Sequence, residues 1–347
     1  MNNPGLRVGL VGLGAMGRHH ARVLRALDGV DLVAAADPMG DVHGVLGGIP
    51  LVPDVERLLE HRLDYAVVVC PTAHHEAVGL ALAEAGVPAL IEKPLAHDAV
   101  AAARLVEAFE SRGLVAAVGH VERYNPALQS LRTRLEAGEL GEVYQVATRR
   151  QGPFPNRIAD VGVVKDLATH DLDLTAWVSG AEYRSVSART ANKSGRPHED
   201  LVTVLGELSS GVIANHLVNW LSPLKERVAI VTGDRGCFVA DTLTADLTFF
   251  ANGSTRTEWD AVSAFRGVSE GDMTRYAIPK REPLTVEHEA FRDAVEGKPN
   301  ASIVTLRQGL RAVLVAEAVL ESARTGETVF AGADGPALDR HPATASN

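Results

Sequence analysis

The sequence has few cysteines, no long apolar run and no excess of positive charge. Of its 347 residues only Cys70 and Cys237 are cysteine, and both lie in apolar contexts far from each other. We therefore expect free thiols and a cytoplasmic protein in place of a disulfide-stabilised one. A thiol buried in apolar surroundings is inert, so Cys70 is interpreted as a small core residue and not as a nucleophile.

Two further absences exclude classes of partner. No stretch approaches the roughly 20 uninterrupted apolar residues of a transmembrane helix, and the start of the chain has neither the charged nor the apolar region of a signal peptide. The formal net charge of −10 and the pI near 5.7 argue against a nucleic-acid or anionic-membrane surface. We expect no membrane and no nucleic-acid partner, although a local basic pocket stays compatible with this charge.

The length and the element pattern indicate two domains with different sheets. Residues 6 to about 121 alternate between apolar strands and helices, as a parallel sheet requires, whereas short strands joined by tight turns follow from residue 142. We predict an α/β protein with an N-terminal Rossmann doubly wound parallel sheet (1–121). A C-terminal α+β domain with a largely antiparallel open sheet (122–330) and a disordered tail (331–347) complete the prediction.

A glycine cluster between the apolar run 6–11 and a predicted helix at 18–27 is the main binding motif. Gly12 permits a tight turn, Gly14 lets backbone N–H groups approach a pyrophosphate, and Gly17 lets the helix pack closely. The helix N-terminus then faces the negative charge of the phosphates. This order of strand, glycine turn and helix predicts a bound dinucleotide.

Asp37 selects between the two nicotinamide dinucleotides. It ends the second apolar run, 20 residues after Gly17, where a carboxylate accepts hydrogen bonds from the adenosine ribose. The carboxylate would repel a 2′-phosphate, and no arginine follows it in Pro38-Met39-Gly40, so we predict NAD. The alternative is an ordinary turn acid before proline.

Two later strand ends carry polar residues at the edge where open α/β sheets bind their ligands. One strand ends at Pro71, Thr72 and His75, and the next runs directly into Glu92-Lys93-Pro94. Proline ends the ladder and favours an extended backbone before it, so Lys93 lies on a stiff junction. We expect the cofactor to be bound by Gly12, Gly14, Ala15, Met16, Gly17, Asp37, Pro71, Thr72, His75, Glu92 and Lys93.

Oxidation of an alcohol by a nicotinamide enzyme requires a base for the hydroxyl proton, and Lys93 and His170 are the candidates. In a helix predicted around 166–178, Asp166 lies one turn from His170 and would orient its ring. The alternatives are a solvated lysine and a surface Asp–His pair. A metal is not predicted, because one helix supplies too few ligands.

Taken in this order and at these separations, the glycine turn, Asp37, Glu92-Lys93-Pro94 and the 166–173 segment resemble the Gfo/Idh/MocA family of NAD(P)-dependent oxidoreductases. The resemblance covers the chain to about residue 330. It implies a catalytic set of Lys93, Asp166 and His170.

Segments 119–126, 149–157, 160–164 and 219–221 resemble members of this family that oxidise the 3-hydroxyl of UDP-N-acetylglucosamine-type nucleotide sugars. A diphosphate needs a basic pocket, for which the candidates are Arg123, Arg149, Arg150 and Arg157, and we expect at least two of these to be strand or loop charges. The predicted substrate-binding residues are Arg123, Tyr124, Asn125, Arg157, Asp166 and His170.

Two other functions stay open: an inositol or free-sugar dehydrogenase, and a catalytically inactive NAD-binding sensor or structural subunit. A sheet with one helix-covered face leaves its other face to a partner subunit. We therefore expect a homodimer or homotetramer formed through the C-terminal sheet, with a small-molecule sugar or nucleotide sugar as the substrate.

Overall fold

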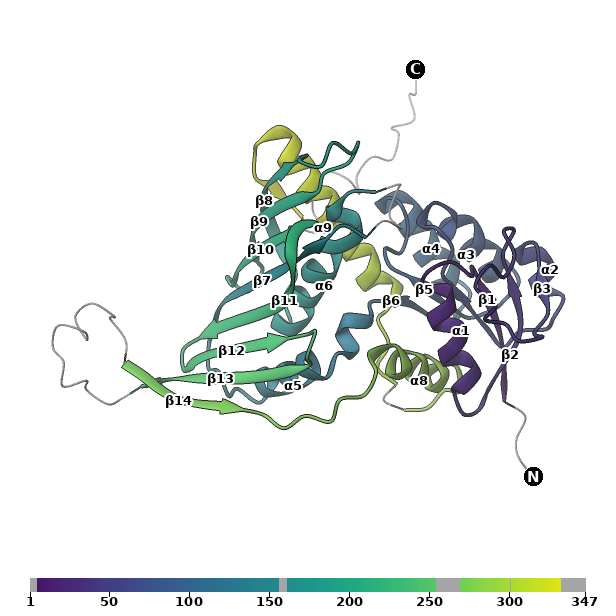
Figure 1. The fold of residues 1–347 in the computed structure, drawn as a ribbon, viewed down its shortest axis with the longest axis horizontal. Coiled ribbons are helices and arrows are strands. Elements are labelled where there is room, and N and C mark those ends of the chain that lie inside the picture. The colour runs from purple at the N-terminus through teal and green to yellow at the C-terminus, as the bar shows by residue number, and fades with distance from the viewer. Residues whose placement is uncertain (1–4, 156–160, 254–268, 300, 332–347) are drawn as a thin grey trace, which may run out of the picture. The chain divides into compact units, whose positions relative to one another are not determined.

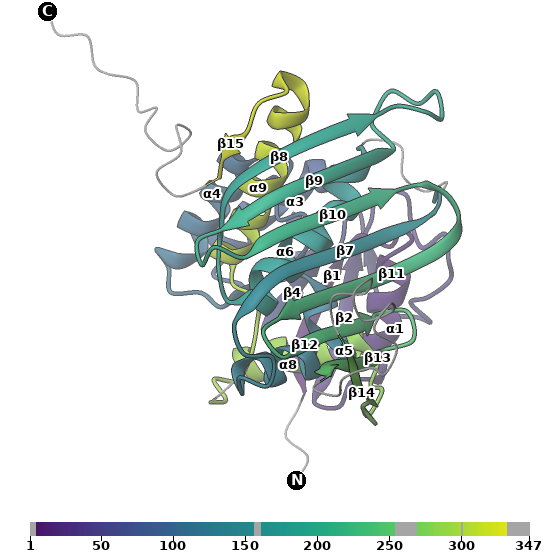
Figure 2. The ribbon, with the colours of Figure 1, turned by 90° about the vertical axis from the view of Figure 1, so that its left-hand side faces the viewer.

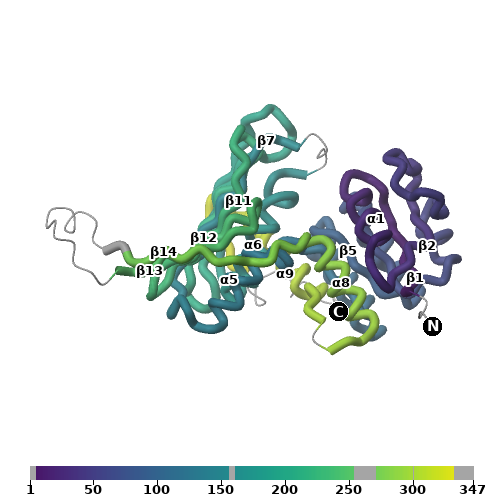
Figure 3. The backbone as a smooth tube through the Cα atoms, turned by 60° about the horizontal axis from the view of Figure 1, so that its bottom comes forward, coloured from purple at the N-terminus to yellow at the C-terminus, as the bar shows by residue number. Residues whose placement is uncertain are grey.

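The computed structural model describes residues 5–155, 161–253, 269–299 and 301–331. The chain forms two compact units, and neither is continuous in sequence: the first comprises residues 1–129, 156–159 and 278–314, and the second 130–155, 160–277 and 315–347. The sequence-based boundaries put residues 122–330 in one domain, whereas residues 278–314 return to the first unit. Figure 3 shows this return as the chain leaves β14 (Ser269–Arg275) and continues into α8 (Pro283–Val295).

A six-stranded parallel sheet forms the centre of the first unit (Figure 1). Its order is β3-β2-β1-β4-β5-β6, which reverses direction between β1 and β4 as the two halves of a doubly wound sheet require. The central strands are apolar runs that are buried along almost their whole length, as expected of strands covered on both faces. The strands are β1 (Leu6–Val11), β2 (Val30–Ala36), β3 (Leu51–Val52), β4 (Tyr65–Val68), β5 (Ala89–Glu92) and β6 (Ala116–Gly119).

Helices cover both faces of this sheet. On one face, Leu24 of α1 and Phe291 of α8 pack with Tyr65 in one apolar cluster. On the other face, α2, α3 and α4 pack in a second cluster together with the first part of α9. The helical elements are α1 (Gly17–Ala26), α2 (Val55–Leu59), η1 (Thr72–His74), α3 (His75–Glu84), α4 (Ala99–Glu110), η2 (Val121–Tyr124), α5 (Pro126–Glu136) and α9 (Leu306–Thr325).

The second unit is built on a nine-stranded sheet, which Figure 2 shows face on. Its order is β14-β13-β12-β11-β7-β10-β9-β8-β15, and all neighbours are antiparallel except β7 and β10. The largely antiparallel sheet predicted from the sequence is therefore confirmed. The strands other than β14 are β7 (Val143–Pro153), β8 (Tyr183–Ala191), β9 (Leu201–Leu208), β10 (Ile213–Asn219), β11 (Leu221–Gly233), β12 (Gly236–Asp241), β13 (Asp246–Gly253) and β15 (Val329–Phe330).

The two faces of this sheet differ in character. Along β7 and β10 alternate residues are buried, and Thr148 pairs with His216 in the parallel register. Beneath β7 lies one helical segment, a π-turn over η3 (Val164–Ala168) that continues as α6 (Thr169–Ser179). The opposite face exposes large apolar side chains, among them Leu205, Phe250 and Met273.

Within the described residues, no helix combines the length and apolar character needed to cross a membrane.

Candidate active site

The glycine turn has the geometry that the sequence predicts. Gly12 adopts φ +98°, and a Cβ there would lie 2.6 Å from the backbone N of Cys70. A Cβ on Gly17 would lie 2.2 Å from the carbonyl oxygen of Gly12, so the helix start packs directly on the turn. A Cβ on Gly14 would meet no atom within 4 Å. The turn is thus closed on its inner side by backbone and open above Gly14.

The N-terminus of α1 has no side-chain cap and no acidic residue in its first turn. Helix N-termini leave N–H groups without intrahelical acceptors, and these groups with the helix dipole attract an anion. Ala15 and Met16 lie at this helix start, both partly exposed. The open space above Gly14 and the uncapped N-terminus together fit a pyrophosphate.

Asp37 follows β2 and binds the glycine turn from the side. Its Oδ2 accepts a hydrogen bond of 2.7 Å from the backbone N of Leu13, and its Oδ1 accepts one of 2.8 Å from Met39. Each carboxylate oxygen keeps further acceptor capacity, because an ionised carboxylate offers about four lone-pair sites. The residue therefore orders the loop and presents a negative charge beside it.

The end of β4 is tied to the Lys93-Pro94 junction by a buried imidazole. His75 Nε2 lies 2.9 Å from the carbonyl oxygen of Cys70, and its Nδ1 lies 3.0 Å from that of Pro94. Burial lowers the pKa of His75, and the ring is only 1% exposed. The sequence predicts His75 as a cofactor ligand, whereas the structure gives its ring two protein partners. Pro71 is exposed and Thr72 partly exposed at the same strand end.

Glu92 and Lys93 complete this edge of the sheet. The Glu92 side chain is buried, and its Oε2 accepts a hydrogen bond of 2.9 Å from the backbone N of Lys93. The Lys93–Pro94 peptide bond is cis. Glu92 packs over the neighbouring strand at Gly119, where a Cβ would lie only 3.1 Å from Glu92 Cδ. The carboxylate is thereby fixed against both its strand and the lysine backbone.

Three further buried titratable residues surround Glu92, and sequence reasoning did not single them out. His20 Nε2 lies 3.1 Å from Glu92 Oε1, and His20 Nδ1 lies 2.9 Å from His288 Nε2. Glu287 precedes His288 on α8, and its side chain is 1% exposed. His20 lies in the stretch that the sequence assigned to a helix, but its partner on α8 is 268 residues away. No local pattern indicates such a contact.

The charges in this cluster are distributed unequally. Burial, the largest influence, raises the pKa of Glu92, but the hydrogen bond and charge of His20, with the charge of Lys93, hold that pKa below its ordinary value. Burial and the nearby Glu92 carboxylate raise the pKa of Glu287 well above its ordinary value. Burial and the charge of His20 lower the pKa of His288. These influences favour the ionised form of Glu92 and the protonated form of Glu287.

In the second unit, Asp166 and His170 lie in one helical segment that changes type between them. Asp166 belongs to the π-turn η3 and is 8% exposed, while His170 lies in α6 and is partly exposed. Glu199 fixes the start of this segment, since its carboxylate accepts a hydrogen bond of 3.1 Å from the N of Val164. The sequence predicts a continuous α-helix here. A π-turn changes the spacing of side chains around the axis and is common at functional sites.

The residues predicted for the substrate occupy different settings. Arg123, Tyr124 and Asn125 follow β6 and are buried, with Asn125 Oδ1 accepting a hydrogen bond of 3.0 Å from Ala127 at the start of α5. The hydroxyl of Tyr124 donates to the carbonyl of Ser302 at 3.2 Å. Arg157 lies outside the described residues.

Arg149 and Arg150 point to opposite faces of β7, because successive strand residues alternate. Arg150 Nε lies 2.7 Å from Asp171 Oδ2, and both side chains are 3% exposed. Arg149 forms an exposed ion pair with Glu226 at 2.7 Å. Two of the four candidate arginines are therefore held by carboxylates of the second unit, in agreement with the expectation that at least two are strand or loop charges.

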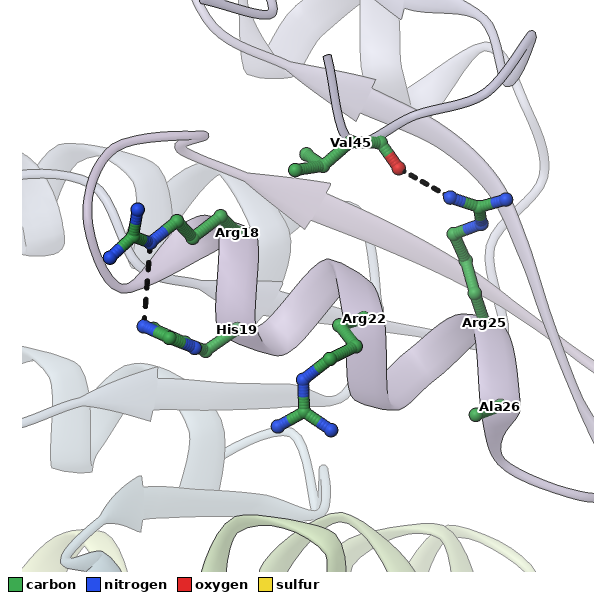
Figure 4. Close-up of a pocket in the computed structure, with 6 residues that line it drawn as sticks. All are labelled: Arg18, His19, Arg22, Arg25, Ala26 and Val45. Carbon is green, nitrogen blue, oxygen red and sulfur yellow. Dashed lines mark hydrogen bonds between the residues drawn. The ribbon is translucent and has the colours of Figure 1, made fainter. Parts of the chain in front are cut away.

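A cavity of about 520 Å³ lies along the outer face of α1 (Figure 4). Arg18, Arg22 and Arg25 line it, but their guanidinium groups point in different directions. Arg22 pairs with Glu282, and Arg25 donates to the carbonyl of Val45 at 2.6 Å. The arginines do not converge on a common point, so this cavity is not an anion site of the kind that a diphosphate needs.

Two further observations concern the cysteines and the metal-ligating side chains of the described residues. Cys70 and Cys237 are free, as predicted, and burial raises the pKa of the Cys70 thiol to about 12. Such a thiol is not a nucleophile at neutral pH. In the part of the chain that the structure describes, no three His, Cys, Asp or Glu side chains are grouped to hold a metal ion.

Comparison with known proteins assigns both halves of the chain to one family. Residues 6–120 match the model of the "Oxidoreductase family, NAD-binding Rossmann fold", and residues 132–330 match that of the "Oxidoreductase family, C-terminal alpha/beta domain". The chain is 32% identical to the UDP-N-acetylglucosamine 3-dehydrogenase of Acidithiobacillus ferrooxidans over 84% of its own length and 88% of that protein. It is 36% identical to inositol 2-dehydrogenase 4 of Saccharopolyspora erythraea over 61% of its length and 66% of that protein.

A solved structure of the Acidithiobacillus ferrooxidans UDP-N-acetylglucosamine 3-dehydrogenase superposes with a TM-score of 0.79 at 29% identity, covering 92% of this chain and 98% of that one. The fold and the glycine turn thus define an NAD-dependent dehydrogenase that acts on CH–OH groups. The chain belongs to the Gfo/Idh/MocA family of oxidoreductases, whose relatives named above act on sugar hydroxyls and related polyols.

Proposed function

We propose that the chain oxidises the 3-hydroxyl of a UDP-N-acetylhexosamine-type nucleotide sugar to a ketone with NAD. The observation that carries this proposal is the 32% identity to a UDP-N-acetylglucosamine 3-dehydrogenase, which extends over 88% of that relative and so includes both domains. The match of the fold over 98% of a structure of that enzyme supports it further. We expect the enzyme to be cytoplasmic.

Lys93, Asp166 and His170 are proposed as the catalytic set, because they stand at the family motif positions. NAD, when bound, would supply the acceptor for the hydride that leaves the carbinol carbon. His170 takes the proton of the hydroxyl, and Lys93 hydrogen-bonds the oxygen on which negative charge develops. Asp166 orients the imidazole ring and stabilises its protonated form. The products are a ketone, NADH and one proton.

Two substitutions test this set. Lys93→Met removes the amine while keeping a long side chain, and His170→Asn keeps polarity without a base. Each is expected to lower kcat by about a hundredfold or more, since a positioned acid or base contributes 10²–10⁴-fold. The pH dependence of kcat then separates the roles, because the variant that lacks the general base loses the acid limb of the profile. Turnover near wild type in both variants would refute the assignment.

Arg123, Tyr124, Asn125 and Arg157 are proposed to bind the substrate. Arg157→Ala is expected to raise the KM for the nucleotide sugar by about tenfold or more, because a charged hydrogen bond to phosphate contributes roughly 1.5–3 kcal/mol. Arg149→Ala is a matched control, since Arg149 pairs with Glu226. A KM that is unchanged in Arg157→Ala would count against a diphosphate in the substrate.

An inositol dehydrogenase is the second candidate. The 36% identity to inositol 2-dehydrogenase 4 favours it, although that match spans 66% of the relative. An inositol carries no diphosphate, so a substrate panel separates the two activities. An inactive NAD-binding sensor or structural subunit is the alternative from another class, and NADH formation from any substrate of the panel would exclude it.

We also propose that the chain assembles as a homodimer or homotetramer through the outer face of the nine-stranded sheet. This face exposes Leu205, Ile213, Phe250 and Met273, each between 40% and 66% exposed. Light scattering coupled to size-exclusion chromatography gives the mass directly, and Leu205→Glu with Phe250→Glu is expected to yield a monomer. A wild-type monomer would contradict this mode of assembly.

A further inference from the structure

The buried cluster of His20, Glu92, Glu287 and His288 is not used by the chemistry proposed above. All four residues are at most 9% exposed, and they lie on three elements, α1, β5 and α8. Ionisable groups are seldom buried unless they are paired, because removing a charge from water is costly. A cluster of four directly behind Lys93 therefore requires a role.

The hydrogen bonds of this cluster form one line. It runs from His288 Nε2 to His20 Nδ1 over 2.9 Å, from His20 Nε2 to Glu92 Oε1 over 3.1 Å, and from Glu92 Oε2 to the backbone N of Lys93 over 2.9 Å. An ionised Glu92 only accepts, so His20 donates from Nε2. His20 Nδ1 lies 2.9 Å from His288 Nε2, and one of these two nitrogens donates to the other.

The groups at the His288 end of this chain of hydrogen bonds are consistent with donation toward Glu92. His288 Nδ1 is buried and has no hydrogen-bond partner in the structure. The carboxyl oxygens of Glu287 likewise have none. A neutral imidazole with a bare Nδ1 and a protonated carboxyl group cost less to bury than their charged forms. The only full negative charge among these four residues is then on Glu92, at the end that touches Lys93.

We propose that Glu92 is a positioning residue for Lys93, and that His20, with His288 behind it, holds the Glu92 carboxylate in the orientation that fixes the lysine backbone. This inference rests on the catalytic role proposed for Lys93. In this arrangement α8 supports the Glu92-Lys93-Pro94 motif, although the helix lies almost 200 residues further along the chain. Glu287 adds a neutral neighbour in place of a second negative charge.

The titratable groups that face Glu92 come from every side. His20 lies on α1, Glu287 and His288 lie on α8, and Lys93 follows in the chain. His75 on α3 also lies near Glu92. Burial lowers the pKa of His75, and the charge of Glu92 opposes that lowering. β6 faces Glu92 with Gly119. Of these groups, His20 provides the largest of the influences that lower the pKa of Glu92.

A matched pair of substitutions isolates the bond from His20 to Glu92. The amide nitrogen of glutamine falls near the Nε2 position of histidine, and that of asparagine falls near Nδ1. His20→Gln therefore keeps a donor for Glu92 and loses the contact with His288. His20→Asn leaves Glu92 without its donor but keeps an amide beside His288 Nε2, and that amide can present either its oxygen as an acceptor or its nitrogen as a donor. Both variants remove the imidazole ring of residue 20. They differ in whether the contact with Glu92 or the contact with His288 is kept.

The proposal predicts that kcat of His20→Asn is lower than that of His20→Gln by about tenfold or more, with substrate KM within about twofold. Burial then acts on Glu92 without the opposing hydrogen bond, so its pKa rises and the acid limb of kcat moves to higher pH in His20→Asn alone. Carboxyl ¹³C NMR of the protein without cofactor, assigned with Glu92→Gln, reads the same rise directly.

Equal kcat, equal acid limbs and equal Glu92 titration in the two His20 variants would overturn the proposal. If His20→Asn does not fold, His288→Gln and His288→Asn repeat the comparison one bond further along, and only His288→Asn is expected to lower kcat. His216→Gln controls for loss of any buried histidine, because His216 is 0% exposed among Thr148 and Tyr183 in the second unit. Normal turnover in Lys93→Met would instead refute the catalytic role of Lys93, and the NMR titration would still test the bond.

Discussion

A substitution at Gly14 is expected to change the affinity for the cofactor without lowering the stability of the fold. A Cβ added there meets no protein atom within 4 Å, and its φ lies outside the left-handed region. Gly14→Ala is therefore expected to leave the free energy of unfolding unchanged or to raise it by about 0.4–1 kcal/mol. The added methyl group would occupy the open space above the helix N-terminus, where a pyrophosphate approaches the backbone.

The magnitude follows from the hydrogen bonds that the methyl group would displace. A hydrogen bond to a charged group contributes roughly 1.5–3 kcal/mol, so the loss of one bond raises the Kd for NADH by about 10- to 150-fold. Gly17→Ala is the contrasting variant, because its Cβ would lie 2.2 Å from the Gly12 carbonyl oxygen and the turn itself must shift. It is expected to lose both affinity and about 1–3 kcal/mol of stability.

Fluorescence titration with NADH and thermal unfolding without cofactor measure the two effects separately. Gly152→Ala serves as the control glycine, since a Cβ there makes only an ordinary contact of 3.6 Å with Lys225. A Kd of Gly14→Ala within twofold of wild type would refute the assignment of this turn to the pyrophosphate. A lowered unfolding temperature in that variant would show that the space above Gly14 is not open.

Three other predictions concern charge. Arg150→Leu removes one partner of the buried ion pair with Asp171 and is expected to cost about 3–5 kcal/mol in urea unfolding, part of which the double variant with Asp171→Leu recovers. The folded-state pKa of Glu287 lies above its ordinary value of 4.5, so the protein loses stability as the pH rises above 4.5 toward that folded value. Glu287→Gln is expected to flatten the decline of unfolding free energy as the pH rises above 4.5, and an unchanged slope would contradict the buried acid. Asp37→Ser removes the charge that repels a 2′-phosphate and is expected to lower the ratio of kcat/KM for NAD over NADP by about tenfold, whereas an unchanged ratio would place the selectivity elsewhere.

Local patterns in the sequence predict most of the first unit, because its strands are continuous apolar runs and its turns are marked by glycine and proline. The apolar run at 6–11 coincides with β1, and the helix predicted at 18–27 agrees with α1 to within one residue. β3 was missed, since two residues with little burial carry no periodic signal.

The second unit was predicted less completely. Only short strands joined by tight turns were expected after residue 142, without bounds for single strands, whereas β7 and β11 are 11 and 13 residues long. The outer face of this sheet carries apolar side chains such as Phe250 and Met273, so the alternation of apolar and polar residues that marks a half-exposed strand is lost. The π-turn at η3 was also missed, because its residues have the composition of an ordinary helix.

The residues of the candidate site could also be predicted only in part from the sequence. The motif residues Gly12, Asp37 and Lys93 follow from spacing along the chain, but the partners of Glu92 do not. His20 and His288 meet because α8 returns to the first unit and packs beside α1, and this contact is set by tertiary packing. The opposite orientations of Arg149 and Arg150 follow from strand alternation once the strand through both is known.

Oxidation of a nucleotide sugar with NAD is the activity that we propose for this chain. The most direct test follows NADH formation by absorbance with purified protein and a panel of UDP-N-acetylhexosamines, free N-acetylhexosamines and inositols, with NAD and NADP in parallel. We expect NADH formation from a UDP-N-acetylhexosamine, with a 3-keto sugar as the product and with kcat/KM about tenfold or more above that for any inositol. Preferential oxidation of an inositol, or no reduction of NAD by any member of the panel, would contradict it.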